Sequence, residues 1–160
     1  MSKSKAELPS LSKLIPPERI ALNIQAVDWQ EAIRISGKLL LDSQIISPEY
    51  IDAMIATAEE LKQYIVIAPG IAMPHARPEA GALQTGMSLV TLAPPINFGN
   101  HNHDPVRLVF ALAALDKHLH VRAMQNLAEL LLSKELVSQL MAANSIPEVQ
   151  AVFTKAEAMK

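Results

Sequence analysis

The residues best suited to chemistry lie in the segment 68–79, APGIAMPHARPE, where His75 stands between two prolines and close to Arg77. Pro74 fixes the backbone just before His75, and Pro78 restricts Arg77, so a stiff loop presents the imidazole at the end of a strand. A neutral imidazole is a competent nucleophile near neutral pH, and a guanidinium can hold phosphoryl oxygens. The residue types therefore favour phosphoryl chemistry, although a turn without a catalytic role also explains a histidine in a proline-rich loop.

A longer stretch around this histidine, IAPGIAMPHARPE, resembles the active-site signature of the mannitol/fructose-type enzyme IIA family of the bacterial sugar phosphotransferase system. The APG-AMPH-RPE form is most similar to the ascorbate-like branch of that family. The resemblance covers roughly residues 20 to 155, including the helix 50–64, the FALAALDKH region and the MQNL helix. It implies that His75 accepts a phosphoryl group from phospho-HPr and donates it to a sugar-specific enzyme IIB. Such a phosphotransferase component needs no cofactor and no metal.

A regulatory protein of the same fold is the alternative function. In nitrogen-type IIA proteins the phosphorylation state of the histidine controls binding to a target outside transport. Both functions predict phosphorylation of His75. They differ in the next step, because a transport component passes its phosphoryl group to an enzyme IIB and a regulator does not.

The resemblance also implies a second histidine near the start of the helix that follows the long apolar strand, and His118 occupies that place. A helix start exposes unpaired N–H groups and a partial positive charge, which suits an incoming phosphoryl group. We expect His118 to donate a hydrogen bond to the phosphoryl oxygens. His120 lies two positions later, so we expect it on another face of the helix, at the surface.

One position departs from the family pattern. Mannitol-type members carry an arginine near the end of the helix before the active-site strand, whereas this chain has Thr57, followed by Glu59 and Glu60. Arg77 is the expected substitute for that arginine. Glu59 and Glu79 are candidate hydrogen-bond partners that orient the site.

The loop 97–105, NFGNHNHDP, places His101, His103 and Asp104 close together and allows a metal site, which a metal-dependent hydrolase could use. A metal needs three or four converging ligands, whereas the Gly, Asn, Asp and Pro residues of this loop are already typical of turns. We therefore predict a turn and no metal.

Strands and helices that must position these residues alternate along the chain. This alternation predicts a single α/β domain, residues 18–160, with a mixed β-sheet flanked by helices on both sides. Residues 1–17 are predicted to form an N-terminal arm or a partly docked turn. The expected strands are 19–26, 64–67, 71–73, 87–92 (ended by two prolines) and 106–115, the last covered on both faces. The expected helices are 28–43, 48–62, 118–132, 136–141 and 147–158, with Asp28 and Asp116 as the expected caps of the first and third.

Composition excludes several classes of protein. The formal net charge is −2 and 4% of the residues are aromatic, so neither the clustered cations nor the stacking surfaces of a nucleic-acid-binding protein are expected. The longest apolar stretch, residues 108–115, is too short to insert across a bilayer, and the N-terminus lacks the apolar core of a secretory signal. The absence of cysteine excludes a thiolate nucleophile and fits a cytoplasmic location.

Overall fold

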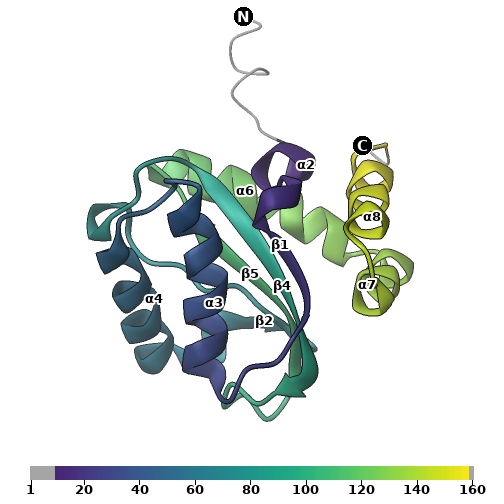
Figure 1. Cartoon of the computed structure of the whole chain (residues 1–160), viewed down its shortest axis with the longest axis horizontal. Helices are drawn as coiled ribbons and strands as arrows, with labels where there is room; N and C mark the ends of the chain where they lie inside the picture. The colour runs from purple at the N-terminus through teal and green to yellow at the C-terminus, as the bar shows by residue number, and fades with distance from the viewer. Residues whose placement is uncertain (1–9, 159–160) are drawn as a thin grey trace, which may run out of the picture.

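A mixed sheet of five strands runs through the centre of the part of the chain that the structure describes (Figure 1). This computed structural model describes residues 10–158, apart from the side chains at positions 62 and 63. The strands are β1 (Ile20–Ile24), β2 (Val66–Ala68), β3 (Ile71–Ala72), β4 (Gly86–Ile96) and β5 (Val106–Ala113). They lie in the order β1-β4-β5-β3-β2; β1 is parallel to β4 and β3 to β5, and the other neighbouring pairs are antiparallel.

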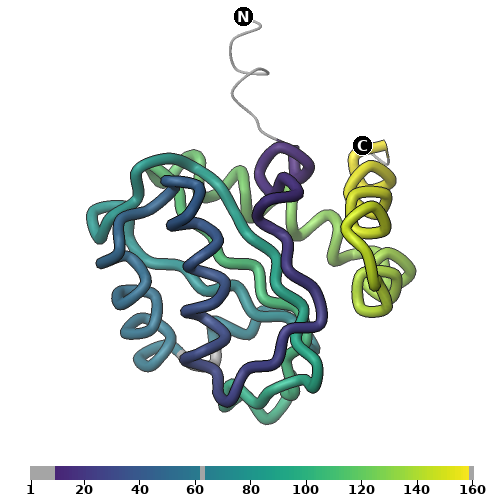
Figure 2. The backbone as a smooth tube through the Cα atoms, viewed as in Figure 1, coloured from purple at the N-terminus to yellow at the C-terminus, as the bar shows by residue number. Residues whose placement is uncertain are grey.

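Helices cover both faces of this sheet (Figures 1 and 2). One face carries α3 (Trp29–Asp42) and α4 (Pro48–Glu60), and the other carries α2 (Leu11–Leu14), α6 (Lys117–Leu131), α7 (Lys134–Ala142) and α8 (Ile146–Ala158). Shorter turns of helix are α5 (Lys62–Ile65), η1 (Pro17–Arg19) and η2 (Pro78–Ala80). Within residues 10–158, no helix combines the length and the apolar character needed to cross a bilayer. The predicted α/β domain with a mixed sheet between helical layers is confirmed.

The two long central strands, β4 and β5, are buried on both faces. Successive side chains of a strand point to opposite faces, so each strand contributes in turn to two hydrophobic clusters. The cluster with α6 and α8 contains Met87, Leu89, Leu108, Phe110 and Leu112, and the cluster with α3 and α4 contains Val90, Leu92, Val109, Ala111 and Ala113. The expected central strand covered on both faces is confirmed, although it ends at Ala113 rather than at residue 115.

Predicted cap residues begin two of the long helices, α3 and α6. The side chain of Asp28 accepts a hydrogen bond from the N–H of Glu31 at 2.8 Å, at the start of α3. Asp116 accepts one from the N–H of Leu119 at 2.8 Å, at the start of α6. Each carboxylate satisfies a backbone donor that the first helical turn leaves unpaired.

Two predicted strand boundaries are wrong. Helical turns continue through α5, so the strand expected at 64–67 begins only at Val66. The pair Pro94 and Pro95 does not end β4, which continues to Ile96. The pairing of β4 with β5 is irregular between Thr91 and Ile96, so the prolines lie where the ladder does not require a backbone N–H.

The predicted N-terminal arm divides into two parts. Residues 1–9 lie outside the described residues, whereas α2 and the residue after it pack into the core, with Leu14 2% and Ile15 1% exposed. The Nη2 of the buried Arg19 donates to the carbonyl oxygen of Leu14 at 3.0 Å. Residues 11–15 are therefore part of the packed structure.

Candidate active site

His75 lies where the chain leaves β3, beside the end of β5. Its backbone forms an isolated parallel bridge with Leu112, and the N–H of Leu112 donates to the carbonyl oxygen of Pro74 at 2.9 Å. Because β3 and β5 are parallel neighbours, the chain leaves both strands at the same edge of the sheet. This edge therefore brings the loop of His75 close to the start of α6.

The imidazole of His75 is half-buried and held in one orientation. Its Nδ1 lies 2.9 Å from the carbonyl oxygen of Met73. A carbonyl oxygen can only accept, so Nδ1 carries the proton in this hydrogen bond. The lone pair is then on Nε2, which makes Nε2 the nucleophilic atom of the ring.

A second histidine faces this ring, and it is His120, not His118. The ring centroids of His75 and His120 are 5.2 Å apart, with an interplanar angle of 56°. The expectation that His120 lies at the surface apart from the site is wrong. His118 is exposed, and in the described structure it is not among the side chains that line the pocket at His75. Asp116 and Lys117 precede His120 by four and three positions, so the three residues lie on one face at the start of α6. This face is directed toward His75.

A surface pocket of about 340 Å³ opens over the two histidines. Three segments far apart in the sequence form its wall: the end of α4, the loop after β3 and the first turn of α6. The lining residues are Thr57, Glu60, Leu61, His75, Ala76, Arg77, Pro78, Asp116, Lys117 and His120.

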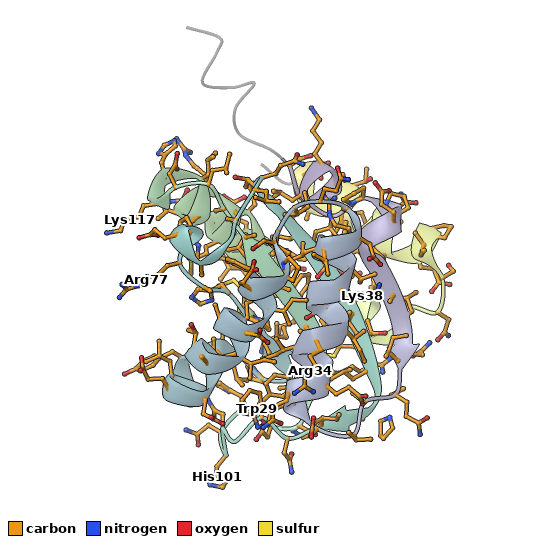
Figure 3. All side chains as sticks on the ribbon, turned by 60° about the vertical axis from the view of Figure 1, so that its left-hand side comes forward. Trp29, Arg34, Lys38, Arg77, His101 and Lys117 are labelled. Atoms are coloured by element: carbon orange, nitrogen blue, oxygen red, sulfur yellow. The ribbon has the colours of Figure 1, made fainter. Side chains whose placement is uncertain are left out.

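Two cations stand at this pocket. Arg77 and Lys117 both line it and are exposed, and their side chains project from the same edge of the molecule (Figure 3). The N-terminus of α6 adds the partial positive charge of a helix start. The arrangement suits a phosphoryl group, and Arg77 was predicted for this role. Lys117 was missed, although its place directly after the predicted cap Asp116 was a signal for it.

The acidic residues lie differently from the sequence-based expectation. Glu60 lines the pocket, whereas Glu59, one position earlier, is exposed and does not line it in the described structure. Glu79 borders a neighbouring hollow of about 670 Å³ that also includes Arg77. The orienting roles of Glu59 and Glu79 remain predictions. Thr57, the residue expected to replace a family arginine, also lines the pocket.

Asp104 stabilises the loop 97–105 through hydrogen bonds to the backbone of the same loop. Its carboxylate accepts hydrogen bonds from the N–H groups of Phe98, Gly99 and Asn100 at 2.8–2.9 Å. These contacts account for Asp104 without a metal. Across residues 10–158, no three side chains of the metal-ligating types converge closely enough to hold an ion.

The pKa of His120 gives a pH-dependent test of this geometry. Burial lowers its pKa below the ordinary value of 6.5, and the neighbouring His75 lowers it further. Between this lowered pKa and 6.5, the unfolded chain binds more protons at His120 than the folded chain does. The stability that neutral His120 contributes is therefore present above pH 6.5 and is lost as the pH falls through the folded pKa. An NMR titration should show His120 titrating below the ordinary value. His75→Ala should raise this pKa without restoring it fully, because burial is the larger cause. A value at or above 6.5 in the wild type would contradict the arrangement.

Comparison with known proteins adds independent evidence. Residues 13–156 match the protein family described as phosphoenolpyruvate-dependent sugar phosphotransferase system, EIIA 2. The mannitol-specific cryptic phosphotransferase enzyme IIA component of Escherichia coli K12 is 41% identical over 145 residues, which cover 91% of this chain and 98% of that protein. The ascorbate-specific PTS system EIIA component of the same organism is 44% identical over 101 residues, which cover 63% of this chain and 66% of that protein.

Solved structures agree with these matches. The solution structure of the mannitol-specific cryptic enzyme IIA from E. coli has a TM-score of 0.82 at 41% identity and covers 92% of this chain and 99% of that one. Enzyme IIAMTL from E. coli, in a complex with phosphorylated enzyme IIBMTL, has a TM-score of 0.76 at 28% identity over 86% of this chain and 95% of that one. The chain therefore belongs to the EIIA 2 family and is a component of the phosphoenolpyruvate-dependent sugar phosphotransferase system.

Proposed function

We propose that Nε2 of His75 carries the phosphoryl group, accepting it from phospho-HPr and passing it to a sugar-specific enzyme IIB in the cytoplasm. The main support for this proposal is the hydrogen bond of the His75 ring. The hydrogen bond from Nδ1 to the carbonyl oxygen of Met73 leaves the Nε2 lone pair free, in a pocket open to a protein partner. Phosphohistidine formation needs this tautomer and this access.

In the proposed first transfer, the Nε2 lone pair forms a bond to phosphorus while the bond from phosphorus to the donor breaks. The electron pair of that bond stays with the donor. Positioning and charge stabilisation supply most of the catalysis in such transfers. Arg77, Lys117 and the first N–H groups of α6 are the positive groups around the pocket, and His120 is the hydrogen-bond donor beside His75.

In the second transfer the same steps run toward an enzyme IIB. The complex formed by the related IIAMTL with phosphorylated IIBMTL supports this choice of partner. The two relatives named above are a mannitol-specific and an ascorbate-specific component, which supports a polyol or a sugar acid as the cargo of the complete transporter.

The test is a reconstituted relay. The chain is incubated with phosphoenolpyruvate, enzyme I and HPr, and the acid-labile mass gain is measured before and after addition of enzyme IIB. We expect one phosphoryl group on the chain, its loss to enzyme IIB, and a ³¹P signal typical of Nε2 phosphohistidine. No mass gain would refute the carrier role. A phosphorylated chain that no mannitol- or ascorbate-type enzyme IIB discharges would favour the regulatory alternative.

A further inference from the structure

We infer that Tyr50 is a positioning residue for phosphoryl transfer. Its hydroxyl group restrains the loop that carries His75 and the end of β5, from which the chain continues to His120. The inference rests on the proposed carrier role of His75. Tyr50 lies in the first turn of α4 and does not line the pocket, so it acts through other residues.

The Tyr50 hydroxyl lies among three backbone groups of the site. It accepts a hydrogen bond from the N–H of Ala76 at 3.0 Å. It also lies 2.9 Å from the carbonyl oxygen of Ala76 and 2.9 Å from that of Leu112. A hydroxyl has one proton and two lone pairs, so it can donate to either carbonyl while it accepts from the N–H.

These contacts restrain the peptide groups around His75. On its N-terminal side, the carbonyl oxygen of Pro74 accepts from the N–H of Leu112 at 2.9 Å. On its C-terminal side, the N–H of Ala76 donates to Tyr50. The first bond joins the loop directly to Leu112, at the end of β5. The second joins it to Tyr50, whose hydroxyl also contacts the carbonyl oxygen of Leu112. The direction in which His75 presents its ring therefore depends on this phenol.

The same contact reaches the second histidine. Leu112 is the next-to-last residue of β5, and the chain then passes through Asp116 into α6 and His120. A single hydroxyl thus ties the loop of His75 to the strand end from which His120 is reached. We expect it to fix the 5.2 Å separation of the two rings.

Burial of an aromatic ring does not explain this hydroxyl. Tyr50 is 0% exposed, and a phenylalanine would fill the same volume without a polar atom to satisfy. Burial also raises the pKa of Tyr50 to about 12, so the phenol keeps its proton throughout the physiological range. The group is a permanent donor and acceptor at the site.

The experiment compares Tyr50→Phe with Tyr64→Phe, the matched control. The chain has two tyrosines, and Tyr64 is 66% exposed, so the control removes the same atom outside the buried contact. Transfer from phospho-HPr is followed by rapid quench at a temperature where circular dichroism shows each variant folded. For Tyr50→Phe we expect the maximal rate to fall about tenfold to a hundredfold, as a small displacement of a reacting group does, with little change in KM. Tyr64→Phe should match the wild type.

A second readout separates positioning from general stability. The ¹⁵N shifts of His75 should report the Nδ1–H tautomer in the wild type and in Tyr64→Phe, and a mixture of tautomers in Tyr50→Phe. If Tyr50→Phe is folded and keeps both the wild-type rate and the wild-type tautomer, the inference is wrong. If the wild type itself takes no phosphoryl group, the proposed function fails instead, so the two failures can be told apart.

A measurement without any substitution covers the case in which Tyr50→Phe does not fold. Incorporation of 3-fluorotyrosine gives two ¹⁹F signals, one for each tyrosine. Phosphorylation of His75 should shift the Tyr50 signal clearly more than the Tyr64 signal. Equal shifts, or no shift at Tyr50, would contradict the proposed coupling.

Discussion

Replacement of His75 by alanine will abolish phosphorylation of the chain by phospho-HPr. The variant removes the nucleophilic Nε2, whose lone pair is free because Nδ1 makes the hydrogen bond to Met73. The chain also has no cysteine that could serve as another strong nucleophile. His120 is not a ready substitute, because it lies on α6 rather than on the loop that carries His75. Mass spectrometry after incubation with phosphoenolpyruvate, enzyme I and HPr should show no gain in mass.

The variant should remain folded, because His75 is half-buried and lies on a loop rather than in either hydrophobic cluster. His75→Gln is a useful companion, since it keeps a polar side chain of similar size but has no nucleophilic nitrogen. Both variants should give the circular dichroism spectrum of the wild type. Persistent acid-labile phosphorylation in either folded variant would place the carrier at another histidine.

Replacement of His120 by alanine has the second largest expected effect, a fall of about a hundredfold in the transfer rate. Removal of one preorganised donor from a developing anionic group costs this much in other enzymes. The variant should still accept a phosphoryl group, because the nucleophile is intact. Rapid-quench measurements of both half-reactions, from phospho-HPr and to enzyme IIB, will give the rates.

His118→Ala is the matched control for this variant. It removes the same side chain two positions earlier on the same helix, from an exposed position. We expect rates within about twofold of the wild type, in the range of an ordinary surface substitution. If His118→Ala slowed the transfer and His120→Ala did not, the placement of the second histidine at His120 would be wrong.

The sequence does not show which of His118 and His120 faces His75. The family resemblance implied a histidine near the start of the helix that follows the apolar strand, and both that strand and the cap at Asp116 were predicted. Which one faces the loop depends on the rotation of α6 about its axis. That rotation is set by its packing on the sheet through Ala123, Leu127 and Leu130, which the local sequence does not reveal.

The sheet was easier to predict than the site. Strands buried on both faces have long apolar runs, and β5 shows this pattern plainly. The role of Tyr50 could not be predicted, because its partners Ala76 and Leu112 are 26 and 62 residues away along the chain. A tyrosine on the apolar stripe of a helix looks like any other core residue until the strand order is known.

The contact between Ser12 and Glu157 has a consequence for how such a chain can be built into larger proteins. The hydroxyl and the N–H of Ser12 donate to the Glu157 carboxylate at 2.7 and 3.0 Å, so both ends of the described chain emerge at one corner, beside α2 and α8 (Figure 1). Arg77 and Lys117 project from a different edge (Figure 3). A module joined just before α2 or just after α8 would start from the same corner, apart from the edge where Arg77 and Lys117 project, so the order of modules in a fusion would matter little for its geometry.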